Sequence, residues 1–291
     1  MMRRALPLLA LLAGLTLPLG AQQKISRRIA IDPDASIRIY NLAGNTRVVG
    51  WDRDSIAVTG ATPPGASFYF GGSGRQAKMG LERDDKMKPA GLGELEIRVP
   101  ARARVWVKST EGWIEVTGLS GEADLGTVGG SIRVSGALRL LTVETLDGTV
   151  EVSGTSQLTR IKTGGGAVTM NRPTGDLTVS TVAGAVALLE AEPATARVET
   201  VSGSVRYEGR VGRLSSLEIQ THSGTVDLLI PRETPAEFDL HSVDGGVIVA
   251  LSPKDPRKPV RGKPLVFGNA GGGAHVMVRT FKADIRLTGR E

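Results

Sequence analysis

The sequence predicts an all-β protein, a parallel β-solenoid resembling a single-stranded β-helix that we expect to be right-handed. The first observation is a row of evenly spaced glycines: Gly112, Gly130, Gly148, Gly166 and Gly184. A fixed period, here about 18–21 residues per coil, is typical of one structural unit stacked on itself. The second is composition: aromatic residues make up only 4% and there are 38 glycines, as expected for a thin interior of small aliphatic side chains.

Each unit also repeats three other positions around its glycine. Three positions before the glycine there is a Thr or Ser, at Ser109, Thr127, Thr145, Thr163, Thr181, Thr200, Thr221 and Ser242. Five positions before it lies an aliphatic residue, at Val107, Leu125, Val143, Ile161, Val179, Val198, Ile219 and Leu240. Two and four positions after it come two further apolar sets, which begin with Ile114 and Val116. The pattern predicts a strand, a bend at the glycine, and a second strand.

A repeat this short has no room for a strand, a crossover helix and another strand. Stacked coils would place equivalent residues about 4.8 Å apart, so each aliphatic set would form a buried ladder. We expect the corner glycines to adopt positive φ, which glycine tolerates best. The hydroxyl column is expected to bond the corner backbone and to have a structural role.

The segment 1–21 has the pattern of a secretory signal. A short basic start is followed by an apolar run from Ala5 to Leu19 and a small residue at Ala21, after which cleavage is expected. The mature chain, 22–291, is therefore predicted to be exported to the periplasm, the cell surface or the medium. It has no cysteine, and no later segment is long enough for a transmembrane anchor.

The mature chain is expected to form one β-solenoid domain with four parts. Degenerate N-terminal coils occupy 22–104 and include a long loop at 61–93, read as a flap over a ligand site or a mobile insertion. Regular repeats occupy 105–252 and a proline-rich excursion 253–275. The last part, 276–291, is predicted to be an atypical terminal coil with Ala283 in the glycine position.

Two groups of residues are candidates for binding. The excursion carries a basic strip that could hold phosphate or carboxylate groups or be solvated: Lys254, Arg257, Lys258, Arg261 and Lys263. Trp106 and Trp113 flank the first regular coil and could stack on sugars or anchor a partner. The alternative, which we favour for the tryptophans, is that they cover the coil edge beneath the 61–93 loop.

The remaining chemistry of the sequence argues against an enzyme. Glu115, Arg133 and Glu151 alternate in sign at equivalent positions of successive units, which favours a stacked ladder of ion pairs. The three histidines lack the ligand spacing of a zinc site, and no catalytic or cofactor-binding motif is found. Removing the signal, with its two arginines, lowers the formal net charge from +6 to +4, too mild for a nucleic-acid binder.

The repeat resembles a known family. The segment Asn41–Gly44 followed by Gly50–Arg53, the segment Ile97–Pro100, and the iterated units from Val107 to Val249 are similar to the putative adhesin family of bacterial extracytoplasmic β-strand-repeat proteins. The resemblance covers nearly all of the mature chain. It implies a parallel β-solenoid at the envelope or cell surface, and it supplies no catalytic residues.

Two classes of function are left by the sequence. The first is a non-enzymatic adhesin or envelope-associated scaffold that binds a cell-surface glycan, an anionic envelope polymer or an envelope protein. The second is a polysaccharide-active β-helix enzyme, which rests on analogy of fold alone.

Overall fold

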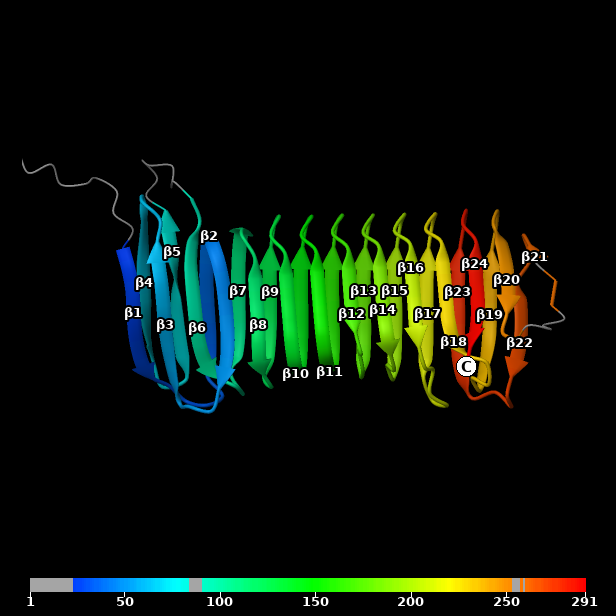
Figure 1. The fold of residues 1–291 in the computed structure, drawn as a ribbon, viewed down its shortest axis with the longest axis horizontal. Helices are drawn as coiled ribbons and strands as arrows, with labels where there is room; N and C mark the ends of the chain where they lie inside the picture. The colour runs from blue at the N-terminus through cyan, green and yellow to red at the C-terminus, as the bar shows by residue number, and fades with distance from the viewer. Residues whose placement is uncertain (1–22, 84–90, 253–256, 259) are drawn as a thin grey trace, which may run out of the picture.

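The structure is a computed structural model that describes residues 23–83, 91–252, 257–258 and 260–291, and in these residues it contains strands and no helix. The strands wind into one elongated rod with two faces, called face A and face B here (Figure 1). None of the described segments is a helix long and apolar enough to cross a bilayer. The expected signal peptide, 1–21, lies outside the described residues.

Face A is a continuous row of hydrogen-bonded strands. Its order along the rod is β4 (Ala66–Ser73), β5 (Gln76–Arg83), the first half of β2 (Ser36–Trp51), β7 (Arg104–Glu111), β9 (Glu122–Thr127), the second halves of β10 (Ile132–Thr145) and β11 (Val150–Thr163), β13 (Asp176–Thr181), β15 (Thr195–Thr200), β17 (Ser216–Thr221), β23 (Ala274–Thr280), β19 (Ala236–Ser242) and β22 (Leu265–Asn269).

Face B takes the other strand of each coil. Its order is β1 (Gln23–Ala30), β3 (Ser55–Thr62), β6 (Gly93–Pro100), the second half of β2, β8 (Ile114–Leu119), the first halves of β10 and β11, β12 (Val168–Asn171), β14 (Val186–Ala191), β16 (Val205–Gly209), β18 (Val226–Pro231), β24 (Ile285–Arg290), β20 (Gly246–Ala250) and β21 (Val260–Arg261). Neighbouring regular coils pair in parallel, which confirms the predicted solenoid, whereas its handedness stays a prediction.

The predicted aliphatic ladders form the core. Val150, for example, is fully buried and stacks in register between Ile132 and Val168. The other members of the three apolar sets are buried as well. Each added coil therefore buries its aliphatic side chains against those of its neighbours, and one apolar interior continues along the rod.

The hydroxyl column has the predicted structural role. The amide of Gly148 donates a hydrogen bond of 3.0 Å to Oγ1 of Thr145, and the same bond recurs from Thr127 to Ser242 and again at Thr280. Each bond satisfies a backbone donor at a buried corner, where an unpaired N–H would be costly.

The predicted reason for the corner glycines is wrong. Among the repeat glycines from Gly112 to Gly245, only Gly112 has positive φ. At the others an added Cβ would collide with the neighbouring coil, as at Gly130, where it would lie 1.6 Å from the carbonyl oxygen of Gly112. Positive φ occurs instead at the opposite corner, with the same period, at Gly118, Gly136, Gly154, Arg172 and Glu190.

Three expectations for the chain outside the regular repeats are also corrected. About half of the expected loop 61–93 forms β4 and β5, an antiparallel hairpin that pairs with β2 through β5. The excursion 253–275 includes the antiparallel strands β21 and β22. The coil at 276–291 is last in sequence but not in the stack, because β23 lies between β17 and β19 while β24 lies between β18 and β20.

Antiparallel strands close both ends of the rod. At one end β4 and β1 are the edge strands of the two faces, and at the other end β22 and β21 take that place. Aromatic rings cover the last layer of core on face A: Phe68 and Phe70 of β4 pack on it at one end, and Phe267 of β22 stacks on Phe238 at the other. The rings therefore shield the two ends of the apolar interior from water.

Candidate binding groove on face A

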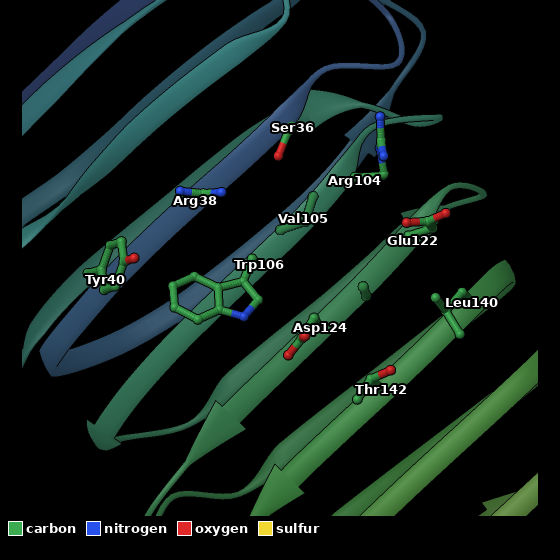
Figure 2. A pocket seen from close by; sticks show the side chains of 11 residues that line it. Ser36, Arg38, Tyr40, Arg104, Val105, Trp106, Glu122, Asp124, Leu140 and Thr142 are labelled. Atoms are coloured by element: carbon green, nitrogen blue, oxygen red, sulfur yellow. The ribbon is translucent and has the colours of Figure 1, made fainter.

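Aromatic and charged side chains gather on face A near the N-terminal end. There β2, β7, β9 and β10 frame a groove of about 390 Å³ (Figure 2), within the size range of small-molecule sites. Its lining side chains are Ser36, Arg38, Tyr40, Arg104, Val105, Trp106, Glu122, Ala123, Asp124, Leu140 and Thr142.

Strand register decides which of these side chains are neighbours. Arg38 of β2 pairs with Trp106 of β7, and Trp106 pairs in turn with Asp124 of β9. Buried residues such as Ile37 and Val105 alternate with these outward residues along the strands. The period of two that builds the core therefore also fixes the groove side chains on the solvent side.

An aromatic pair lines the groove. The rings of Tyr40 and Trp106 meet edge to face, with their centroids 4.9 Å apart, an arrangement that aromatic pairs favour. The ammonium group of Lys108 lies 5.2 Å from the Trp106 ring centroid. Figure 2 shows the indole lying across β7 beside Tyr40 and Arg38. The pair gives the groove an aromatic surface bordered by polar groups.

The charged groups of the groove differ in their ion pairing. Asp124 is paired with Lys108 at 3.5 Å, and Glu122 is paired with Arg139. Within the described residues, neither Arg38 nor Arg104 makes an ion pair.

A second hollow of about 280 Å³ adjoins the groove and shares Ser36 and Arg38 with it. Its outer wall is Gly71 and Gly72 of β4, and Lys78 of β5 also lines it. The Lys78 ammonium lies 5.1 Å from the Tyr40 ring centroid and 5.5 Å from that of Tyr69. Burial, followed by the charge of Glu82, raises the pKa of Tyr69 to about 12. Its phenol is therefore protonated at neutral pH.

Of the two predicted tryptophans, only Trp106 belongs to this groove. Trp113 lies at the start of face B, beneath the guanidinium of Arg47 at 5.7 Å from its centroid, and its backbone amide bonds Oδ1 of Asn45. The favoured interpretation, that both cover an edge under the 61–93 segment, is wrong for Trp106, because β5 and β2 separate β7 from the edge strand β4.

The predicted basic strip lies at the opposite end of the rod. Lys254 is outside the described residues. The Arg257 guanidinium packs over the Phe267 ring at 4.0 Å, while Lys258, Arg261 and Lys263 are exposed around β21. The strip and the tryptophans therefore do not form one site, and the binding role of the strip stays a prediction.

The predicted ladder of alternating charges on face B forms in part, because Glu115 pairs with Arg47 rather than with Arg133. Arg133 bonds Glu151 at 2.9 Å, and Glu115 bonds Arg47 of the inserted β2 coil at 3.0 Å. These exposed pairs, each worth up to about 1 kcal/mol, hold neighbouring coils in register. In the described part of the chain no cluster of three or more His, Asp or Glu side chains is arranged to hold a metal ion.

Sequence reasoning missed Arg38, Tyr40, Lys78 and Arg104 as binding residues. Three of them come from β2 and β5, and β5 lies in the segment expected to be a loop. The available signal was the alternation in Ser36–Tyr40, which resembles that of Arg104–Lys108. That signal identifies a site only when the two segments are known to be adjacent strands.

Comparison with known proteins supports the fold. Residues 90–288 match the model of the Toastrack DUF4097 family. The chain is similar to a crystal structure of a putative adhesin from Parabacteroides merdae, with a TM-score of 0.51 and 9% identity over 90% of this chain and 96% of that one. It is also similar to a putative lipid binding protein from Parabacteroides distasonis, with a TM-score of 0.52 and 10% identity over 92% of this chain and 98% of that one.

No curated protein has a matching sequence. At identities this low the two structures establish a shared fold and nothing about ligands. The family match covers well over half of the chain, including all the regular coils. The chain therefore belongs to the Toastrack DUF4097 family.

Proposed function

We propose that this protein is an exported, non-enzymatic binding module that holds a carbohydrate polymer of the cell envelope or surface in the groove on face A. The observation that carries the proposal is the Trp106–Tyr40 pair, set on the outer face among groups able to hydrogen-bond sugar hydroxyls. An aromatic platform with polar borders suits sugar rings, which have apolar faces and polar rims.

Three further observations support this function. The chain begins with the sequence pattern of an export signal. One of the similar structures is described as a putative adhesin. The groove continues into the hollow beside β4 and β5, so that an extended chain could occupy both.

The test compares two tryptophan variants of the mature protein, 22–291. Binding to arrays of soluble glycans and envelope polysaccharides is measured for the wild type, Trp106→Ala and Trp113→Ala. Loss of the platform should weaken binding at least tenfold, about 1.4 kcal/mol, because aromatic anchors dominate interface energies. Trp113→Ala removes the same residue type from face B and should bind as the wild type does. No binding to any glycan, or equal losses in both variants, would contradict the proposal.

A further inference from the structure

We infer that the groove selects acidic sugars, with Arg38 and Arg104 binding the carboxylate of a uronic-acid unit whose ring lies on Trp106. The inference rests on the proposed function and specifies its ligand class. It follows from how charge is distributed across the groove.

The cations of the groove and of the adjoining hollow gather toward β2 and β5, although Arg104 also lies opposite Glu122 of β9 in register. Arg38, Arg104 and Lys78 belong to the neighbouring strands β2, β7 and β5 respectively, and none of them makes an ion pair within the described residues. Like charges on adjacent strands repel one another unless a counter-charge lies between them. Such a cluster on an outer face is suited to an external anion, and two guanidinium groups suit a carboxylate better than a point charge does.

Register places this cluster beside the aromatic surface. Arg38 is the direct cross-strand neighbour of Trp106. Arg104 lies two positions before Trp106 on the same strand, with Ser36 opposite it on β2 and Glu122, which is paired with Arg139, opposite it on β9. A sugar ring stacked on the indole would therefore have a guanidinium group on two sides. Its exocyclic acid group could reach either of them without leaving the ring face.

The opposite wall of the groove has a different character. Asp124 and Glu122 on β9 are compensated by Lys108 and Arg139, and Thr142 of β10 follows them. Carboxylates of this kind accept hydrogen bonds from hydroxyl groups. The two sides of the groove therefore differ in chemistry. The side toward β9 and β10 offers acceptors for hydroxyl groups, and the side toward β2 and β5 offers cations for an anion.

A second groove on the same face has no such cluster. Near the C-terminal end Glu218, Glu237 and Asp239 line a hollow of about 270 Å³, and each of them is paired with a basic residue. An acidic polymer therefore finds no uncompensated cation among these groups, in contrast to the N-terminal groove.

The experiment uses matched polymers with and without charge. Binding of the mature protein is measured by calorimetry with polygalacturonate, with its fully methyl-esterified form, with dextran sulfate and with dextran. The wild type should bind polygalacturonate at least tenfold more tightly than the ester at physiological ionic strength. It should also prefer polygalacturonate to dextran sulfate, since the guanidinium groups are placed for a carboxylate beside a stacked ring.

The variant Arg38→Gln/Arg104→Gln should lose the preference for the acid form and still bind the ester. Arg133→Gln removes a similar exposed charge from face B and should keep the preference, with circular dichroism showing that all variants fold. Binding of acid and ester with equal affinity, sensitive to Trp106→Ala, would overturn this inference and leave the proposed function standing. A stronger preference for dextran sulfate would overturn the assignment to carboxylates. Failure to bind any polymer would instead contradict the proposed function itself.

Discussion

Gly148 and Gly130 stack so closely that a Cβ atom on Gly148 would lie 1.9 Å from the carbonyl oxygen of Gly130. Gly148→Ala should therefore force two coils apart and destabilise the protein by at least about 3 kcal/mol, at the upper end of overpacking costs. The urea midpoint measures the loss. Gly129→Ala is the matched control, because its Cβ would meet no atom within 4 Å. Equal midpoints for the two variants would show that the coils do not stack this tightly.

The inside and outside of the solenoid can be distinguished with one residue type. Val150→Asp places a carboxylate in the apolar column between Ile132 and Val168, where burial raises its pKa. It should be severely destabilising at neutral pH, and the deficit should shrink as the pH falls toward about 4, because the neutral acid is buried at lower cost. Thr149→Asp, on the exposed neighbouring position, should change thermal stability little at either pH. Similar damage from both would mean that the faces are misassigned.

The hydroxyl column can be tested at one corner. Thr145→Val keeps the shape of the side chain but removes the acceptor for the Gly148 amide. We expect a loss of about 1–3 kcal/mol, typical of a buried donor left without a partner. Thr145→Ser keeps the hydroxyl and should recover most of that stability in the same denaturant titration. If Ser and Val destabilise equally, the hydrogen bond does not stabilise the corner.

Tyr207 should make the stability of the fold depend on pH in the alkaline range. Its ring is fully buried between Leu188 and Leu228, and its hydroxyl donates to the carbonyl of Arg210 at 2.6 Å. Burial raises the pKa of this phenol well above its usual value near 10. The folded state therefore keeps the proton. The free energy of unfolding falls progressively as the pH rises above 10, because there the phenol ionises in the unfolded chain and not in the folded one. Tyr207→Phe should be about 1 kcal/mol less stable at pH 7 and lose less stability between pH 10 and 12. A parallel decline in both proteins would exclude Tyr207 as the cause.

The basic strip offers a competing site for anions. Lys258 and Arg261 are exposed at the end of the rod opposite the groove. If the groove is the acidic-sugar site, Lys258→Ser/Arg261→Ser should leave the affinity for polygalacturonate within about twofold. Compared with the wild type, this variant should show weaker non-specific attraction to anionic surfaces, and the difference should be clearest at low salt, where screening is weak. A loss as large as that from Arg38→Gln/Arg104→Gln would assign the binding to the strip.

Much of the fold could be predicted because one residue type recurs at each position of a coil. The aliphatic sets, the Thr column and the ion pair of Arg133 with Glu151 all follow from the glycine period. The reason for the corner glycines could not be predicted, since a close approach between coils and a positive φ both select glycine. The β2 coil was harder to read because the buried Asn41 and Thr46 replace the usual residues and bond one another at 2.9 Å.

The groove depended on information that the repeat does not contain. Trp106 stands out in the sequence as an isolated aromatic residue, whereas its neighbours Arg38 and Tyr40 lie on a strand much earlier in the chain. A period identifies which residues stack only when successive coils are also successive in sequence. It fails where a coil from elsewhere in the chain is inserted, and that insertion brings Arg38 and Tyr40 beside the indole.

The two inserted coils set the order in which this rod can be completed. The coil of β2 lies between β5/β6 and β7/β8, all of which are synthesised after it, and β23 and β24 separate two coils that are synthesised before them. A chain emerging from its N-terminus thus cannot add coils one by one in sequence order. The coil of β19 and β20 must wait for β23 and β24, which follow it in the sequence, before it acquires its parallel neighbour. Assembly of the coils from β17 onward is therefore coupled to synthesis of β23 and β24, and a product truncated before β23 would expose an open sheet edge.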